Sequence, residues 1–199
     1  MAIKSSLMNM VLVLTLVCLG ASAAVAVVYA VTKDPISAAE VAKKNAAIKE
    51  VVPQFDNNPY EEALDIIADF NAPDKTNKVY PAKKGGEIVG YAVESTTTKG
   101  FGGPFTIMVG FTPDGAVYNT SVISHSETPG LGAKITDSKS GFITQWNGKN
   151  LTDGSLNVSV KKDGGDIDAI TASTISSRAF CDAMETAASI FNNISSEKQ

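Results

Sequence analysis

Cysteine and histidine are almost absent from this sequence of 199 residues, which has two cysteines and one histidine. Cys18 lies within a long apolar run and Cys181 in a polar part of the chain, so we expect no disulfide between them. So few thiol and imidazole groups exclude a disulfide-rich scaffold and a Cys/His metal site. His125 has serine neighbours but no G-x-S-x-G elbow accompanies it, so a Ser-His-acid hydrolase is not expected.

Clusters of basic residues are also lacking. The chain has 17 Lys and Arg against 21 Asp and Glu, a formal net charge of −4 at pH 7. A nucleic-acid surface needs clustered Lys and Arg, so we expect no nucleic-acid partner. Neither a P-loop nor a G-x-G-x-x-G strand-to-helix unit is present, so the sequence predicts no NAD site of its own.

One long run without charge stands out at residues 7–31. As a helix it would be about 37 Å long, enough to cross a hydrocarbon core of about 30 Å. A cleaved signal peptide is the alternative, but its apolar region would span only about 7–15 residues. We therefore expect a transmembrane anchor at 7–31. Lys4 before it favours the cytoplasm for residues 1–6, so we expect the part after the anchor to lie outside the cytoplasm.

The polar remainder begins with signals for helices. Asp34 and Pro35 suit the start of a helix that Pro53 would end, and Asn58 suits the N-cap of a second helix. We therefore expect residues 32–75 to form a helical, membrane-proximal region.

Alternating hydrophobicity replaces this pattern from Val79 onward. It predicts strands, whereas apolar residues at spacings of three and four predict a helix from Ile175 to Ile194. We expect residues 76–199 to form an α+β domain, an antiparallel sheet with flanking helices, preceded by one N-terminal transmembrane helix. The expected strands are 87–97, 104–111, 116–124 and 155–162, with a turn at 112–115 and a short helix within 137–149.

The start of the last helix is rich in hydroxyl groups, with five among seven residues: Thr171, Ser173, Thr174, Ser176 and Ser177. One such side chain is enough to cap a helix, and Ser173 or Thr174 is suited to that role. A helix N-terminus also stabilises anions through its free N–H groups. A hydroxyl here is therefore suited to carry a phosphate ester, with Thr171, Ser173 and Ser176 donating hydrogen bonds to it.

Two glycine-rich loops precede this segment, "KGFGGPF" at 99–105 and "ETPGLG" at 127–132. Each is interpretable as a turn. The alternative is a binding loop, since glycine permits close approach of backbone to a flat ligand.

Residues 168–174, "DAITAST", resemble the flavinylation motif of the covalent FMN-binding family, and "ETPGLG" resembles its second hallmark. Both occur in the family's order, behind an anchor. Ala172 and Ser173 depart from the motif, which usually has glycine and alanine there. Within the family, the chain resembles the flavin subunits of Rnf-type ion-translocating complexes. The alternative is a flavin subunit of the sodium-pumping NADH:quinone reductase. A third possibility is a membrane-anchored binding or assembly domain without redox chemistry.

The resemblance implies FMN joined covalently by a phosphoester to Thr174. A flavin transferase would move FMN from FAD, and Asp168 and Thr171 would belong to what this enzyme recognises. The chain would relay electrons within a membrane complex that connects ferredoxin and NAD and translocates protons or sodium ions. Its partners would be the other membrane subunits and the lipid bilayer.

The second hallmark would hold the flavin ring. The resemblance implies that Leu131 touches the ring and that Glu127 and Thr128 lie near its polar edge, with Gly132 in the same loop. The flavin carries the chemistry, so no catalytic acid–base pair is needed in the sequence.

Overall fold

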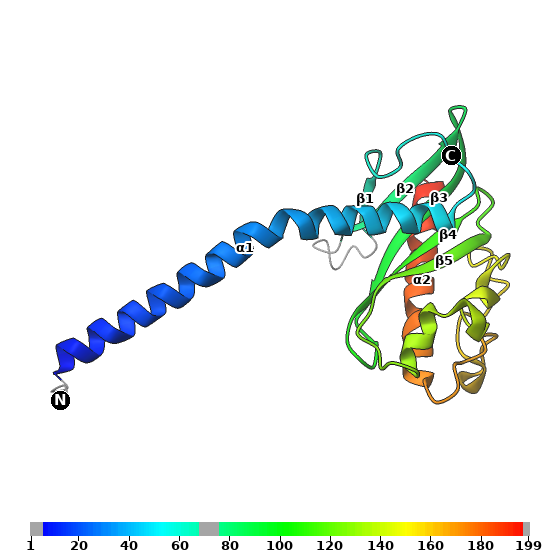
Figure 1. Cartoon of the computed structure of the whole chain (residues 1–199). Coiled ribbons are helices and arrows are strands. Elements are labelled where there is room, and N and C mark those ends of the chain that lie inside the picture. The colour runs from blue at the N-terminus through cyan, green and yellow to red at the C-terminus, as the bar shows by residue number, and fades with distance from the viewer. Residues whose placement is uncertain (1–5, 68–75, 197–199) are drawn as a thin grey trace. The chain divides into compact units, whose positions relative to one another are not determined.

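The structure is a computed structural model that describes residues 6–67 and 76–196 (Figure 1). By their contacts the residues divide into two units, Met1–Ala42 and Lys43–Gln199. The helices are α1 (Leu7–Val51) and α2 (Thr174–Ser196). The strands are β1 (Leu64–Ile67), β2 (Thr76–Lys84), β3 (Glu87–Thr97), β4 (Phe105–Phe111) and β5 (Val117–Ser124). The expectations for residues 1–5, including Lys4, and for 68–75 lie outside the described residues.

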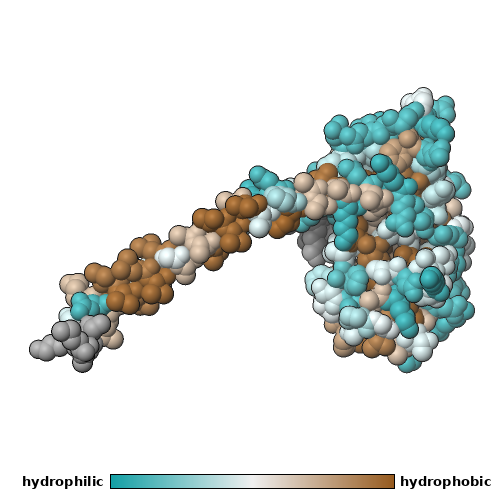
Figure 2. Space-filling model, in the orientation of Figure 1, coloured by the Kyte–Doolittle hydropathy of each residue, from teal (hydrophilic) through white to brown (hydrophobic). Residues whose placement is uncertain are grey.

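Helix α1 contains the predicted anchor and is long and apolar enough to cross a membrane. Its large apolar side chains are exposed between Leu7 and Val31, where Figure 2 shows a mostly hydrophobic surface with a few paler patches. The predicted start of a new helix at Asp34 is wrong, because Pro35 lies inside α1. Proline removes one helical hydrogen bond, but the Ala-, Glu- and Lys-rich sequence after it favours the helix strongly enough to continue. The helix ends at Val51, two residues before Pro53, as predicted.

The five strands form one antiparallel sheet in the order β1-β2-β3-β4-β5. The predicted strands at 87–97, 104–111 and 116–124 are confirmed as β3, β4 and β5. The turn between β4 and β5 is confirmed too: Gly115 has a φ of 87° and donates to the Thr112 carbonyl at 2.9 Å.

Two further elements differ from prediction. The helix expected from Asn58 is wrong: turns occupy residues 59–62, and β1 follows, pairing with Thr76–Val79 of β2. Pairing with a neighbouring strand here overrides the local helix signals. The strand expected at 155–162 is also wrong; this segment makes only an isolated bridge between Val160 and Ile167, and four short 3₁₀ segments lie between β5 and α2.

Helix α2 packs on one face of the sheet, behind the strands in Figure 1. The largest core cluster joins its apolar side to alternate residues of β3 and β4. Phe180 lies at its centre, with its ring 5.7 Å from that of Trp146 and 5.2 Å from that of Phe142. Cys181 is buried in the same cluster, and burial raises the pKa of its thiol to about 12.

The last turns of α1 lie on the other face of the sheet. Ile48 and Val51 are buried there in a second, smaller cluster with Tyr80 and Met108. The backbones of α1 and β4 lie close together here, because a Cβ on Gly110 would overlap the carbonyl oxygen of Val51.

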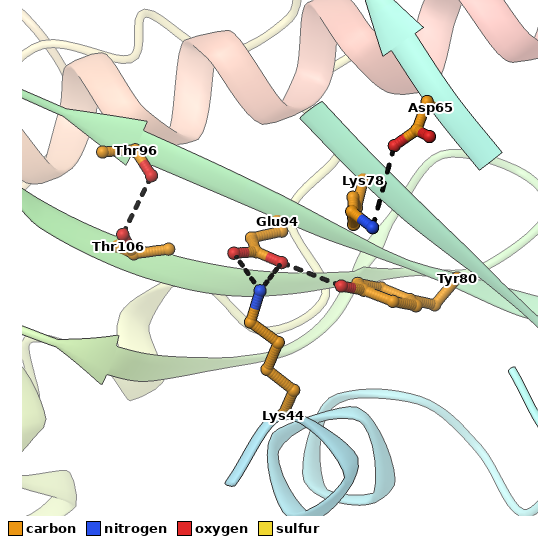
Figure 3. Close-up of polar contacts among 7 residues, drawn as sticks. All are labelled: Lys44, Asp65, Lys78, Tyr80, Glu94, Thr96 and Thr106. Carbon is orange, nitrogen blue, oxygen red and sulfur yellow. Dashed lines mark hydrogen bonds and ion pairs between the residues drawn. The ribbon is translucent and has the colours of Figure 1, made fainter. Parts of the chain in front are cut away.

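A polar contact accompanies this cluster (Figure 3). Lys44 Nζ lies 2.8 and 2.9 Å from the two carboxylate oxygens of Glu94, and the Tyr80 hydroxyl donates to Glu94 Oε2 at 2.8 Å. Burial and the Glu94 charge raise the pKa of Tyr80 far above its usual value, so its hydroxyl stays a donor. These three residues fix the end of α1 on the sheet.

Candidate functional site

A cavity of about 350 Å³ lies where three segments meet: the glycine-rich loop after β3, the 127–132 loop and the start of α2. Ten residues line it: Phe101, Glu127, Thr128, Leu131, Gly132, Ala172, Ser173, Thr174, Ile175 and Ser176. Seven of the predicted site residues are therefore brought together, although 42 positions separate Gly132 from Thr174 in the sequence.

The N-terminus of α2 opens into this cavity. Thr174 is the first residue of the helix, and the first intrahelical bond runs from the Ser177 N–H to the Ser173 carbonyl at 3.0 Å. The N–H groups of Thr174, Ile175 and Ser176 precede that bond, so they have no helical acceptor. Free donors and the partial positive charge of a helix start suit an anionic group.

Ser173 does not cap α2 with its side chain. Its hydroxyl is buried and has no hydrogen-bond partner. Ser177 instead links the loop to the helix, accepting from the Ile170 N–H at 2.9 Å and donating to the Ser173 carbonyl at 3.0 Å. Of the two candidates for the cap, Ser173 makes no such hydrogen bond, and Thr174 is already the first residue of the helix.

The residue before Ser173 has an unusual backbone. Ala172 has a φ of 62°, and it is the one residue other than glycine with positive φ in the described part of the chain. A side chain is disfavoured in this left-handed conformation, which glycine adopts freely. This explains physically why glycine suits this position of the motif.

Glu127 connects the three segments. It is 5% exposed, and its Oε2 accepts from the Ser176 hydroxyl at 2.7 Å. Its Oε1 accepts from the backbone N–H of Gly102 at 3.2 Å. Gly132 leaves room for this arrangement, because a Cβ there would overlap Glu127 Oε2.

Two predicted site residues lie outside this cavity. Asp168 and Thr171 line a second cavity of about 440 Å³, together with Lys134, Gln145 and others. Asp168 is exposed and pairs with Lys161 at 2.7 Å. In the first half of the motif Asp168, Ala169 and Thr171 are therefore exposed while Ile170 is buried, and the second half lines the smaller cavity.

Three apolar residues of the smaller cavity were not predicted as site residues: Ala172, which the sequence shows only as a departure from the motif, and the larger Phe101 and Ile175. The side chain of Phe101 is 68% exposed and that of Ile175 is 49% exposed. The glycines around Phe101 point to its loop but not to its side chain. Ile175 fits the spacing of the buried stripe of the helix, yet it lies on the cavity side of the first turn.

His125 has a local role. Its Nδ1 accepts the backbone N–H of Glu127 at 3.2 Å, which helps to hold the start of the 127–132 loop.

Comparison with known proteins identifies the family. Residues 100–189 match the family described as FMN-binding domain, a range that contains all three segments of the cavity. The chain is 34% identical over 171 residues to the G subunit of the ion-translocating oxidoreductase complex of Vibrio vulnificus (strain YJ016), covering 84% of this chain and 81% of the relative. It is 38% identical over 169 residues to the corresponding protein of Haemophilus influenzae (strain PittEE), covering 83% and 81%.

The chain belongs to the family of G subunits of ion-translocating oxidoreductase complexes. The resemblance found in the sequence is thereby confirmed. The chain is also similar to the crystal structure of Shewanella oneidensis NqrC, with a TM-score of 0.50 and 23% identity over 61% of this chain and 60% of that chain. At this identity the likeness shows the fold alone, so it does not favour the quinone-reductase alternative.

The cavity fits FMN. Its volume is within the range of about 300–1,000 Å³ that is usual for ligand pockets. Phe101, Leu131 and Ile175 present exposed apolar side chains suited to a flat ring, and the N-terminus of α2 suits a phosphate. The other side chains are mainly hydroxyls and one carboxylate, which suit the polar edge of a flavin.

Proposed function

We propose that this chain is the electron-carrier subunit of an Rnf-type, ion-translocating ferredoxin:NAD oxidoreductase complex. It would relay electrons through FMN joined covalently to Thr174. The observation that carries the proposal is the position of Thr174 at the first residue of α2, where the helix start meets the cavity. The FMN-binding domain match and the relatives from ion-translocating oxidoreductase complexes support it.

Thr174 is favoured over Ser173 by accessibility. Thr174 is half-buried and lines the cavity, whereas the Ser173 hydroxyl has almost no exposed surface. An esterifying enzyme has to reach the oxygen that it modifies. Ser173, which replaces the usual alanine of the motif, therefore adds a hydroxyl that does not compete with Thr174 for the ester.

The ester would be made by a flavin transferase acting on FAD. The Thr174 Oγ1–phosphorus bond forms, the pyrophosphate bond of FAD breaks, AMP leaves and the threonine proton is released. We propose that Asp168 and Thr171 serve this step by contacting the transferase, because they face solvent beside the second cavity.

FMN would supply the electron chemistry, and the residues of this chain would bind and orient it. Thr128, Leu131 and Gly132 line one part of the cavity, and Ser173 and Ser176 line the part at the helix start. A covalent bond keeps the site filled whatever the concentration of free flavin, as the limiting case of effective concentration. Electrons would be exchanged with the other membrane subunits of the complex.

The ester is testable in the full-length protein co-expressed with a flavin transferase. We expect the denatured wild-type band to fluoresce as a flavin after electrophoresis, and Thr174→Ala to be dark. Ser173→Ala, which removes the neighbouring hydroxyl, is the matched control and should fluoresce like the wild type. A fluorescent Thr174→Ala band, or a dark wild-type band, would refute the assignment.

We further propose that residues 7–31 span the inner membrane, with residues 1–6 in the cytoplasm. Residues 32–75 would be membrane-proximal and residues 76–199 would hold the flavin on the periplasmic side. The apolar surface of α1 supports the span. A reporter enzyme that is active only in the periplasm, fused after the last residue, should be active. Activity only of a cytoplasmic reporter would reverse the orientation.

A further inference from the structure

Glu127 is the one charged side chain among the ten residues that line the smaller cavity. It is 5% exposed. Within residues 6–67 and 76–196, no Lys, Arg or His forms an ion pair with it. A buried acidic group without a basic partner is costly, and such groups are common where charge has a function.

The hydrogen bonds of Glu127 suit a carboxylate. Its two oxygens accept from the Ser176 hydroxyl at 2.7 Å and from the Gly102 N–H at 3.2 Å, which come from two different segments. Neither donor carries a formal charge, so the negative charge is stabilised without being neutralised. The geometry therefore holds one negative charge at the wall of the cavity.

The positive charge that opposes Glu127 in this cavity is weaker than the charge of a carboxylate. The N-terminus of α2 contributes about half a positive unit, spread over its first N–H groups. The full unit on Glu127 is larger, and burial lets it act with less screening than in water. The net effect at the Glu127 wall is to oppose the addition of negative charge nearby.

We propose that Glu127 lowers the reduction potential of FMN bound in this cavity, an inference that rests on the proposed function. Reduction adds electrons to the bound group, and a fixed carboxylate nearby makes that addition less favourable. With the charge of Glu127, this subunit would thus be a stronger electron donor than it would be without that charge.

The experiment measures the midpoint potential of the full-length, flavin-bearing protein by spectroelectrochemistry, with flavin content from gel fluorescence. Glu127→Gln and Glu127→Met remove the charge at similar side-chain size, and we expect both to raise the midpoint potential. Glu127→Asp keeps the charge and should stay closer to the wild type than either. Glu185→Gln is the control, because it removes one acidic group outside the cavity and should leave the potential unchanged.

Equal potentials in the wild type and the neutral variants would overturn the inference while leaving the proposed function intact. An equal shift in Glu127→Asp and Glu127→Gln would overturn it too, since packing and not charge would then be responsible. If both neutral variants fold but hold no flavin, Glu127 is a binding requirement and the inference fails. A wild-type protein without flavin would instead refute the proposed function, and the inference with it.

Discussion

On one face of the sheet, α2 packs along β3 and β4 through a large and almost wholly apolar cluster. Polar contacts are present here too: the Ser95 hydroxyl donates to the Ala183 carbonyl at 2.8 Å, and the Thr97 hydroxyl donates to Asp182 at 2.7 Å. On the other face, the last turns of α1 make a small apolar cluster and several polar contacts. They include the Lys44–Glu94 pair, and the hydroxyl of Ser121 donating to Glu50 at 2.8 Å.

Because of this difference, the α2 face contributes mainly to stability and the α1 face mainly to the position of α1 on the sheet. Free energy gained by burial scales with apolar area, so the α2 face supplies most of the stability of the unit formed by Lys43–Gln199. Exposed and half-exposed polar pairs contribute little each, but they require one geometry. The α1 face therefore fixes where the last turns of α1 lie on the sheet.

The largest effect is expected from opening the α2 face with Phe180→Ala. Phe180 is fully buried, and its ring contacts those of Phe105, Phe142 and Trp146. Truncation of such a residue leaves a cavity and costs about 3–5 kcal/mol of unfolding free energy. Urea unfolding of the full-length protein in detergent, followed by the fluorescence of Trp146, measures the loss.

A control with the same change is available on the surface. Phe101 is 68% exposed, so Phe101→Ala should change the unfolding free energy by no more than about 0.5 kcal/mol. Similar losses in both variants would contradict the view that the α2 face dominates stability.

A smaller and more local effect is expected on the α1 face from Gly110→Ala. The added methyl group would overlap the Val51 carbonyl, so the last turn of α1 has to move away from β4. Overpacking of this kind costs about 1–3 kcal/mol. Backbone hydrogen exchange should show lost protection in residues 47–51, with less change in α2.

Thr106→Ala is the matched control, because it lies on the same strand and its hydroxyl forms an exposed hydrogen bond with that of Thr96 at 2.8 Å (Figure 3). It should leave the protection of residues 47–51 unchanged. If Gly110→Ala weakens α2 as much as α1, the two faces do not act separately.

The same contrast explains which parts of the fold were predictable from sequence. Strands β3 to β5 and helix α2 each bury at least one side on the large core, so apolar residues mark them clearly in the sequence. The sequence that leads into β1 has the signals of a helix start, and β1 becomes a strand through its pairing with β2. Pro35 reads locally as a helix start, whereas α1 already runs through it.

Much of the site was predictable through the family resemblance. The motifs at 127–132 and 168–174, which carry that resemblance, together with the hydroxyls at the start of α2, lead to seven of the ten cavity residues. Phe101 and Ile175 escape prediction because hydrophobic residues are assigned to the core by default. Asp168 is exposed whereas Thr174 lines the cavity, and this depends on how the loop before α2 turns. The spacing of the motif residues in the sequence does not predict that turn.

The smallest effect is expected at that turn, where Ala172→Gly should stabilise the protein. A side chain at a φ of 62° is strained by about 1–2 kcal/mol, and glycine relieves this but gains freedom in the unfolded chain. The expected net gain is about 0.5–1 kcal/mol in urea unfolding followed by Trp146 fluorescence. Ala169→Gly, in the same loop but without positive φ, keeps only the unfolded-state effect and should lose about 0.4–1 kcal/mol. The two substitutions are chemically identical, so opposite signs would isolate the strain stored before Thr174, and equal losses would show that Ala172 is not strained.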